Sequence, residues 1–482
     1  MTGCQCFWQI RPHVLRLSRS STPHGLHKPH RGYLVCGPSA IYNWRADTSA
    51  HVVTIQAIVT EAYLNHINLA YGNSTLTVSL PKNYVTLLTE RQQPSPPLSE
   101  EALVRRALEA PCGMARLSES VHHGQQIAIV VSDITRPCPT TRLLPPLLSE
   151  LAEAGIQQKD IRIVFALGSH RCHTPEEQAG LVGEAVFGRI CCGDVQPEQF
   201  VAVRRTRRGT PVEVFRPVVE ADWRIYVGNI EYHYFAGYTG GAKALLPGVC
   251  SVETISANHS WMVQDSAMAG RIEGNPVRED IEEAATFVGP SFLLNVVLDG
   301  QWRIVEAVAG DVTLAHRHGC RKVDELYRVL LAERTDVVLA SAGGWPKDIN
   351  LYQAHKALEN AAHAVRDGGI IILLAECGEG IGHPRFAEWL TCGDPPDELL
   401  RRIQEQFVLG GHKAAAIAKI RRRGVRIFLV SSLEAVTVRA MDFVPYASVQ
   451  EALWAARNEI GPVASLIVMP HAGSTLPAMT LS

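Results

Sequence analysis

The chain has 482 residues, of which 46 are Lys or Arg and 48 are Asp or Glu, so its formal net charge at pH 7 is −2. A nearly neutral chain has no general electrostatic attraction to nucleic acid or to an anionic membrane surface. The 46% hydrophobic content is ordinary for a folded protein in water, and no apolar run is long enough to cross a bilayer. We therefore expect two or three domains with cores of their own, no nucleic-acid partner and no membrane partner.

The first 54 residues differ in composition from the remainder. No acidic residue precedes Asp47, whereas Arg, His, Ser and Pro are frequent. An organellar transit peptide and a wrongly assigned start codon both explain such a segment, and we favour the second. Residues 1–54 are therefore predicted to be a poorly ordered extension. The scattered cysteines, none at the spacing of a structural zinc site, indicate free thiols and a cytoplasmic location.

The predicted elements begin with a hairpin over residues 67–80, which has Gly-Asn at its turn. β-Branched runs over 127–132 and 161–167 then predict strands, and helical segments follow them at 141–154 and 175–182. A further strand is expected just before residue 230. Strands that alternate with helices are typical of βαβ units and parallel sheets.

The second half of the chain repeats this pattern. A hairpin is expected over residues 293–309, and from Asp336 a strand, a helix over 353–366 and another strand follow one another. The sequence thus predicts the α/β class, with two α/β domains that have mainly parallel sheets. The first domain is placed at residues 55–325 and the second, which is Rossmann-like, at residues 326–482.

Polar segments follow three of the predicted strands. They are DITRPCP (133–139), GSHRCHT (168–174) and a Gly-rich stretch from His233 to His259 with Lys243 inside it. Any one of them alone is better explained as a turn with surface charges. Open parallel sheets, however, bind ligands beyond the carboxyl ends of their strands. We therefore expect the three segments to converge on one side of the first domain.

Together these segments resemble the nickel-dependent lactate racemase family. A fourth block, DINLYQAHK at residues 348–356, resembles the start of that family's substrate-side helix. The blocks occur in the family's order, and the resemblance extends from about Ile67 to Met469. It implies that the first domain binds a cofactor and that the active site lies in the cleft between the two domains.

The resemblance also implies a cofactor and its attachment. Members of the family use a nickel-pincer nucleotide, pyridinium-3,5-bisthiocarboxylic acid mononucleotide, in which a ring carbon and two sulfurs hold nickel. By motif position, Lys243 matches the lysine that is covalently linked to it and His259 the protein's nickel ligand. Soft sulfur donors and imidazole suit nickel. Thr239, Gly240 and Gly241 are expected to contact the cofactor phosphate, and enzymes of cofactor biosynthesis are expected partners.

His170 and His233 match the family's two acid/base histidines. Two imidazoles on opposite faces of a planar keto acid can exchange protons with either enantiomer of a 2-hydroxy acid. Further residues resemble the groups that bind the substrate and its carboxylate: Asp133, Arg136, Tyr352, Gln353 and Lys356.

One block departs from lactate-type members, which carry a tryptophan there. The corresponding stretch, residues 407–415, has no tryptophan and places His412 and Lys413 at that point. More room and more positive charge favour a larger or dicarboxylic 2-hydroxy acid, such as malate. The simpler interpretation, that His412 and Lys413 only begin a helix, is equally compatible with the sequence.

The sequence therefore predicts a racemase or epimerase of a small 2-hydroxy acid. Two alternatives stay open: a nicotinamide-dependent dehydrogenase, and a non-catalytic relative that binds a carboxylate or the cofactor. Against the dehydrogenase, no G-x-G-x-x-G follows a predicted strand. Both acid/base histidines are present, which disfavours the non-catalytic relative. A homodimer is compatible with the sequence, which does not determine the oligomeric state.

Overall fold

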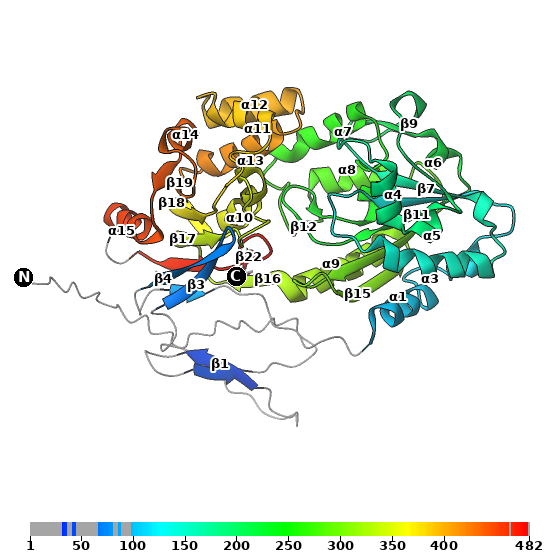
Figure 1. Ribbon diagram of the computed structural model, residues 1–482, viewed down its shortest axis with the longest axis horizontal. Coiled ribbons are helices and arrows are strands. Elements are labelled where there is room, and N and C mark those ends of the chain that lie inside the picture. Colours follow the sequence, from blue (N-terminus) through cyan, green and yellow to red (C-terminus); the bar gives the residue numbers. More distant parts are fainter. Residues whose placement is uncertain are drawn as a thin grey trace, which may run out of the picture. The chain divides into compact units, whose positions relative to one another are not determined.

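The computed structural model describes residues 31–35, 41–44, 66–80, 85–87, 98–461 and 464–480. Of the predicted N-terminal extension only β1 (Arg31–Val35) and β2 (Ile41–Trp44) are described, as an antiparallel pair. The other residues of 1–54 lie outside the described residues. The chain divides into two units. Unit 1 comprises residues 1–90, 329–393 and 420–482, and unit 2 comprises residues 91–328 and 394–419 (Figure 1).

Unit 2 contains a six-stranded sheet in which neighbouring strands are parallel except for one antiparallel edge strand. The strand order is β15 (Ile304–Gly310), β14 (Ser291–Leu298), β11 (Trp223–Asn229), β6 (Ile127–Ser132), β7 (Ile161–Ala166) and β8 (Cys191–Asp194). After β6 the chain adds β7 and β8 on one side and then returns to place β11 on the other. The point where the strand order reverses is therefore between β6 and β11.

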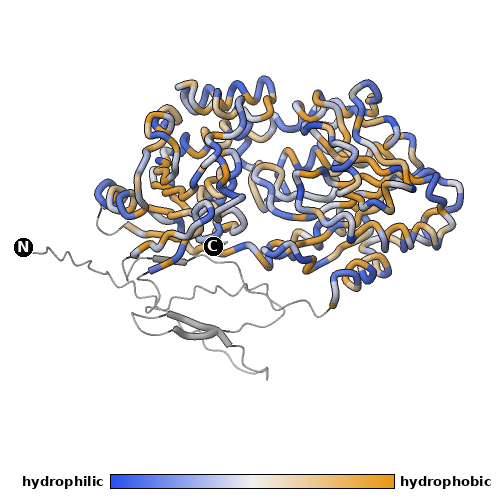
Figure 2. Tube along the Cα trace, viewed as in Figure 1, coloured by the Kyte–Doolittle hydropathy of each residue, from blue (hydrophilic) through white to orange (hydrophobic). Residues whose placement is uncertain are grey.

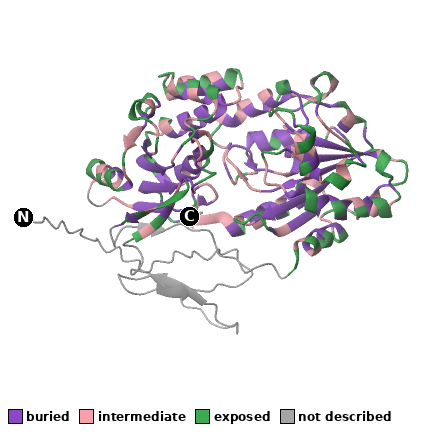
Figure 3. Cartoon of the chain, viewed as in Figure 1, coloured by how far each residue is buried: buried purple, intermediate pink, exposed green. Residues whose placement is uncertain are grey.

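The two faces of this sheet are covered by different helices. Alternate residues of the central strand, Ile127, Ile129 and Val131, are buried in a core with α1 (Glu100–Glu109) and α3 (Thr140–Glu153). The other side packs against η3 (Gly241–Ala244) and α9 (Val312–Tyr327). Figures 2 and 3 show that these central strands are hydrophobic and buried. Continuous burial on both faces explains the nearly unbroken apolar runs.

Unit 2 also contains shorter elements. They are α2 (Leu117–Ser120), η1 (Gln158–Asp160), α4 (Pro175–Val182), α5 (Glu184–Phe187), η2 (Pro197–Gln199), β9 (Phe200–Arg205), β10 (Pro211–Phe215), α6 (Arg216–Glu220), β12 (Tyr232–His233), β13 (Gly237–Tyr238), α7 (Val252–His259), η4 (Ser260–Val263), α8 (Pro276–Ala285) and α12 (Pro396–Glu405). Helix α13 (Gly411–Arg422) begins in unit 2 and ends in unit 1.

Unit 1 has a second six-stranded sheet, and all its pairs are parallel. Its order is β20 (Val444–Tyr446), β19 (Arg426–Val430), β18 (Val365–Leu374), β17 (Thr335–Ser341), β21 (Leu466–Met469) and β5 (Val85–Leu87). The other elements are β3 (His66–Tyr71), β4 (Ser74–Ser79), β16 (Arg328–Leu331), α10 (Leu351–Ala364), α11 (Pro384–Thr391), α14 (Ala435–Ala440), α15 (Val449–Ile460) and β22 (Leu476–Met479).

The structure confirms the α/β class, the mainly parallel sheets and the doubly wound, Rossmann-like second sheet. Both predicted hairpins form, as β3–β4 and β14–β15. The observed grouping of residues differs from the predicted division at 325/326 in two segments. Strand β5 pairs with β21, so residues 66–87 join unit 1. Residues 394–419 join unit 2, where α12 packs on η4. Among the described helices, none is long and apolar enough to span a bilayer.

Candidate active site

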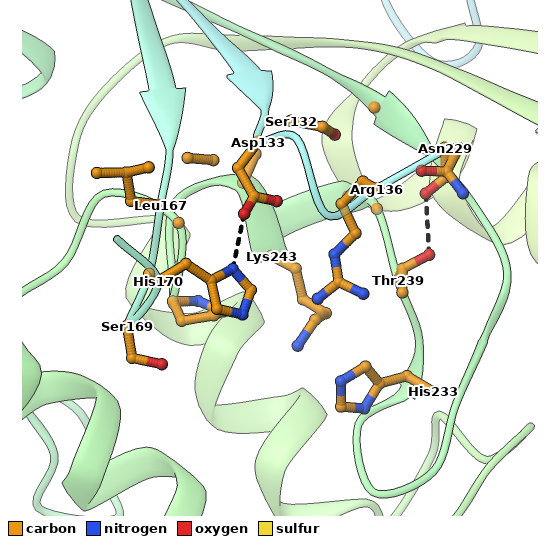
Figure 4. Close-up of a pocket in the computed structure, with 18 of the residues that line it drawn as sticks. Ser132, Asp133, Arg136, Leu167, Ser169, His170, Asn229, His233, Thr239 and Lys243 are labelled. Atoms are coloured by element: carbon orange, nitrogen blue, oxygen red, sulfur yellow. Dashed lines mark hydrogen bonds and ion pairs between the residues drawn. The ribbon is translucent and has the colours of Figure 1, made fainter. Parts of the chain in front are cut away.

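A cavity in unit 2 lies where the strand order of its sheet reverses (Figure 4). The ends of the adjacent parallel strands β6, β7 and β11 and the segments that follow them supply most of its lining. The rest comes from His259 of α7, Asn295 of β14, and Phe407, Leu409 and His412. Such reversal points are where open α/β sheets bind ligands, because the loops diverge there. The predicted site residues that line it are Asp133, Arg136, His170, His233, Thr239, Gly240, Gly241, Lys243, His259 and His412. The predicted convergence of the three polar segments is therefore confirmed.

Asp133 fixes the protonation pattern of the His170 ring. Its Oδ2 lies 2.7 Å from Nδ1 of His170, and Thr135 Oγ1 donates to its Oδ1 at 2.9 Å. Burial alone would raise the pKa of Asp133, but the hydrogen bond from His170 and nearby positive charge lower it below its usual value. Since the carboxylate accepts, Nδ1 of His170 carries the proton and Nε2 keeps its lone pair. The ring is partly exposed.

His173 lies three residues further on and has a different state. Its Nδ1 lies 2.7 Å from Asp194 Oδ1, and its Nε2 accepts the backbone N–H of Ile134 at 3.1 Å. Both nitrogens are thus bonded within the protein, and the ring is buried. His173 holds the loop after β6 in place, whereas His170 keeps one nitrogen available to a ligand.

His233 belongs to a small hairpin. Strands β12 and β13 pair antiparallel, with His233 opposite Gly237. The backbone N–H of Ala236 donates to Nδ1 of His233 at 3.2 Å, so the proton of the neutral ring is on Nε2. Burial, followed by the charges of Lys243 and Arg136, lowers the pKa of His233 well below its usual value. His170 and His233 therefore offer opposite groups, a lone pair and an N–H.

Lys243 is an almost fully buried amine in η3, with 7% of its surface exposed. Its Nζ lies 5.8 Å from the ring centre of Phe235. Burial lowers the pKa of Lys243 well below 10.5, and the charges of Arg278 and Arg136 add to the effect. The neutral form favoured in this way is the nucleophilic form of an amine. Figure 4 shows the Lys243 side chain directed toward the same space as Arg136 and His233.

Gly240 and Gly241 are required by close packing at this loop. Both have positive φ, 70° and 61°. A Cβ on Gly241 would lie 2.8 Å from the ring of His316, and a Cβ on Gly240 would lie 2.4 Å from Oδ1 of Asn295. The N–H of Gly241 donates to that same oxygen at 2.8 Å. Thr239 Oγ1 donates to Asn229 O at 2.9 Å. These groups thus form the cavity wall and hold it in shape.

His259 ends helix α7 and is buried between two aromatic rings. The ring centres of Phe235 and Phe407 lie 4.9 and 5.2 Å away, both edge-on. Its Nδ1 lies 2.9 Å from Oδ1 of the preceding Asn258. Burial, followed by the charges of Lys243 and His412, lowers the pKa of His259 well below 6.5. The neutral imidazole that results is the form that binds metals.

Residues 407–412 close another side of the same cavity. Phe407, Leu409 and His412 line it, whereas the buried Lys413 does not. The ring centres of His412 and Phe407 lie 5.3 Å apart. Nδ1 of His412 accepts the N–H of Gly410 at 3.0 Å, which leaves Nε2 as the other polar group of the ring.

Of the remaining predicted residues, Arg136 lines the cavity, whereas Tyr352, Gln353 and Lys356 are not among its lining residues. Arg136 lies in the cavity and is 4.0 Å from Glu231 Oε1, which is a loose ion pair. Tyr352, Gln353 and Lys356 belong to α10 of unit 1. The side chain of Asn350 caps that helix by accepting the N–H of Gln353 at 3.0 Å. Their contribution to substrate binding stays a prediction.

Several lining or supporting residues were not predicted from the sequence. Phe235 and Phe407 flank His259, and Asn295 holds the Gly241 amide. Asn275, which caps α8, and Arg278 of α8 donate to the carbonyl oxygens of Phe235 and Ala236 in the loop that carries His233. A signal existed for Phe235, which lies inside the Gly-rich block, and for Phe407, which begins the stretch 407–415. The others are ordinary residues of strands, helices and loops, and only the fold brings them to the site.

Family models match most of the chain. The model of the lactate racemase N-terminal domain matches residues 71–270, and that of the lactate racemase C-terminal domain matches residues 330–476. Lactate racemase of Thermoanaerobacterium thermosaccharolyticum is 33% identical over 430 residues, which cover 85% of this chain and 99% of the relative. Lactate racemase of Lactiplantibacillus plantarum is 34% identical over 341 residues, 69% of this chain and 80% of the relative.

Solved structures agree with these matches. The lactate racemase apoprotein from Thermoanaerobacterium thermosaccharolyticum superposes with a TM-score of 0.78 at 32% identity, covering 86% of this chain and all of that one. A protein from Thermotoga maritima shares the fold alone, with a TM-score of 0.57 at 18% identity over 81% of this chain and all of that one. The chain therefore belongs to the lactate racemase family and is an isomerase.

Proposed function

We propose that this protein racemises a 2-hydroxy acid by hydride transfer, with a nickel-pincer nucleotide linked to Lys243. The observation that carries the proposal is the buried amine of Lys243, whose pKa burial lowers, in one cavity with His170, His233 and His259. The relatives named above are lactate racemases, and members of the family need nickel. No feature of the described residues favours the nicotinamide-dependent dehydrogenase or a purely binding role.

The residues present fit such a cofactor. Lys243 would form the covalent link because its neutral amine can attack an acyl group. His259 would bind nickel through Nε2, since its Nδ1 is held by Asn258. Within the described residues no group of three or more His, Cys, Asp or Glu side chains could hold a metal ion. When bound, the cofactor supplies the remaining nickel ligands and accepts the hydride from the substrate's α-carbon.

Small residues at the cavity wall leave room for this large group. Gly240, Gly241 and Thr239 line the cavity and are proposed to lie against the cofactor. Because the Gly241 amide and the Thr239 hydroxyl are already bonded within the protein, we propose that they position the loop.

His170 is the residue best prepared to remove the substrate's hydroxyl proton. Asp133 holds the proton on Nδ1 and stabilises the imidazolium that forms, so Nε2 is the base. The neutral ring of His233 offers its Nε2–H to the substrate oxygen, because its Nδ1 accepts from Ala236. As the base for the other enantiomer, His233 would use the Nε2 lone pair of its other tautomer, in which Nδ1 carries the proton and no longer accepts from Ala236. The pair thus serves the two enantiomers as acid and base.

The substrate's carboxylate is proposed to bind Arg136. Guanidinium offers two parallel donors that match a carboxylate, and Arg136 faces the cavity with only a loose ion pair to Glu231. Lys356, Tyr352 and Gln353 are proposed to add a point charge and neutral hydrogen bonds. Enzymes of cofactor biosynthesis are the proposed partners, and the cytoplasm is the proposed location.

The side chain at position 412 is proposed to set the substrate range. His412 lines the cavity. The resemblance implies that it replaces the tryptophan of lactate-type members, which would make the cavity wider and its wall polar. We propose that lactate is accepted and that a larger or dicarboxylic acid, such as malate, is accepted as well.

Deuterium at the substrate's α-carbon tests the reaction type. We expect the holoenzyme to convert one enantiomer of 2-deuterolactate or 2-deuteromalate into the other in ordinary water with the label retained. Loss of the label to solvent would mean proton abstraction at carbon and would contradict hydride transfer. Reduction of added NAD would favour the dehydrogenase instead.

A further inference from the structure

A chain of buried polar groups lies behind His259. It links Asp280 on α8 with Asn258 and His259 on α7. Asp280 and Asn258 have no exposed surface. Neither residue lines the cavity, and neither has a part in the reaction described above.

The orientation of the Asn258 amide is fixed by its neighbours. One end of the amide faces the carbonyl oxygen of Val277 at 3.2 Å and Oδ2 of Asp280 at 2.8 Å. Both of these groups accept hydrogen bonds, so that end must be the NH₂ group. The other end, Oδ1, therefore faces Nδ1 of His259 at 2.9 Å. An amide oxygen only accepts, so Nδ1 must carry a proton.

This arrangement leaves one nitrogen of His259 for a ligand. With the proton on Nδ1, the lone pair of the neutral ring is on Nε2. Phe235 and Phe407, both edge-on to the ring, restrict its rotation. Metal-binding histidines commonly donate their second N–H in this way, and the outer partner fixes both the tautomer and the ring direction.

Asp280 places a carboxyl group at the far end of the chain. Its Oδ2 accepts from Asn258 and from Thr210 Oγ1, the latter at 2.7 Å. Its Oδ1 has no hydrogen-bond partner among the described residues. A buried carboxyl group with one oxygen that accepts no hydrogen bond polarises the Asn258 amide. Hydrogen bonds in such a chain strengthen one another.

We propose that Asn258 and Asp280 are positioning residues for the nickel centre. Asn258 locks the tautomer and direction of His259 so that Nε2 faces the cavity, and Asp280 increases the electron density that the imidazole donates. The inference rests on the proposed role of His259 as nickel ligand. Outer partners of this kind typically change metal affinity by about 10–100-fold.

Nickel retention by the holoprotein tests the proposal. Wild type, Asn258→Ala, Asp280→Asn, Thr210→Val and His259→Ala are each co-expressed with the cofactor-biosynthesis enzymes. Three quantities are measured: the half-time of nickel loss to a chelator, the absorption spectrum of the nickel centre, and the intact mass. We expect Asn258→Ala to lose nickel about 10–100-fold faster than wild type, with a shifted absorption band and the organic group still attached.

The other variants separate positioning from packing. Asp280→Asn keeps the size and shape of the side chain. It should speed nickel loss and shift the absorption band in the same directions as Asn258→Ala, but by less. If Asn258→Ala fails to fold, Asp280→Asn tests the proposal. Thr210→Val removes a hydrogen bond from the same carboxyl oxygen and leaves the Asn258–His259 hydrogen bond in place, so nickel loss should be no faster than from wild type.

Two results would overturn the inference while the proposed function stands. One is wild-type nickel retention and spectrum in both Asn258→Ala and Asp280→Asn, with nickel absent from His259→Ala. The other is loss from Thr210→Val as fast as from Asn258→Ala, which would indicate packing. Full nickel in His259→Ala would remove the ligand assignment itself, and the inference with it.

Discussion

The two six-stranded sheets each have a point where the strand order reverses, and the two points differ in what occupies them. In unit 2 the point lies between β6 and β11 and opens into the cavity. In unit 1 it lies between β17 and β21. There the turn of the β3–β4 hairpin occupies the end of β17. Ser341 Oγ donates to Ala70 O at 2.8 Å, and the N–H of Trp345 donates to Gly72 O at 2.8 Å.

Polar side chains at these two points are satisfied in different ways. In unit 1, Oδ2 of Asp348 accepts the N–H groups of Gly72 and Glu376, at 2.7 and 3.1 Å. In unit 2, the rings of His170 and His259 line the cavity, and within the part of the chain that the structure describes each is hydrogen-bonded through Nδ1 only. The same sheet topology thus gives a strand end held by hydrogen bonds to a hairpin in unit 1 and a candidate active site in unit 2. Asp348 also bonds through one oxygen only, so the distinguishing feature of unit 2 is the cavity that the His170 and His259 rings line.

The largest effect is expected from Lys243→Ala. Without the amine no covalent link can form, so the purified chain should have the unmodified mass and racemisation should fall to background. Intact mass spectrometry of protein co-expressed with the biosynthesis enzymes checks this. Lys159→Ala, at an exposed lysine, is the control and should be modified as wild type. Cofactor attached to the Lys243→Ala chain would place the link elsewhere.

His170→Ala should lower kcat by about 10²–10⁴-fold, the usual contribution of a general base, with the cofactor retained. Steady-state racemisation assays on mass-verified holoprotein measure it, and His233→Ala is expected in the same range. His173→Ala is the matched comparison. It leaves Asp194 Oδ1 and the Ile134 N–H without the His173 ring, so it should cost about 1–3 kcal/mol of stability instead. Near-normal turnover in His170→Ala would exclude that ring as the base.

His412→Trp should narrow the cavity toward the lactate-type form. We expect the ratio of kcat/KM for lactate to that for malate to rise about 10-fold, within the range that a changed pocket wall gives. The comparison of both substrates with one enzyme preparation is the measurement. Lys413 does not line the cavity, so Lys413→Ala should lower activity on malate relative to lactate by a smaller factor. An unchanged ratio in both variants would show that this segment does not select the substrate.

Asp348→Ala tests the braced strand end of unit 1. Two backbone N–H groups would lose their acceptor, which should destabilise the protein by about 1–3 kcal/mol. Denaturant unfolding measures the loss. Attachment of the cofactor at Lys243 should be unaffected in the folded variant. If the variant were as stable as wild type, the bracing role of Asp348 would be wrong.

The smallest effect concerns stability and pH. In the unfolded chain Lys243 keeps its proton up to about pH 10.5, whereas the folded amine loses it at lower pH. Between these two values the unfolded state binds more protons, so this residue makes stability rise with pH. Lys243→Met apoprotein should therefore melt higher than wild type near pH 7, by about 2–4 °C per kcal/mol recovered. The difference should shrink as the pH approaches 10.5, and a constant or growing difference would contradict the buried neutral amine.

Much of the fold follows from local sequence patterns. The β-branched runs and the periodic segments between them mark β6, β7, α3 and α4 within one residue, because burial on both faces leaves strands almost wholly apolar. The grouping of residues into units does not follow, since it depends on long-range pairing. Strand β5 joins β21 at the far end of the chain, and no local signal in residues 85–87 reveals this.

The part of the candidate site that could be predicted from the sequence consists of the residues in the motif blocks. The strand-end blocks place Asp133, His170 and Lys243 in one cavity because parallel strands end at the same edge. The supporting residues could not be predicted. Asn258 is adjacent to a predicted residue, but the orientation of its amide depends on a hydrogen bond to Asp280 of another helix. Only the packing of the two helices brings these side chains together.

The central claim is that Lys243 carries the nickel-pincer cofactor. Its most direct test is the intact mass of the wild-type chain, with nickel analysis and peptide mapping, after co-expression with the cofactor-biosynthesis enzymes. We predict an added mass that corresponds to the sulfur-bearing pyridinium nucleotide, located on the peptide that contains Lys243, together with about one nickel per chain. An unmodified chain that still interconverts the enantiomers of a 2-hydroxy acid would contradict the account.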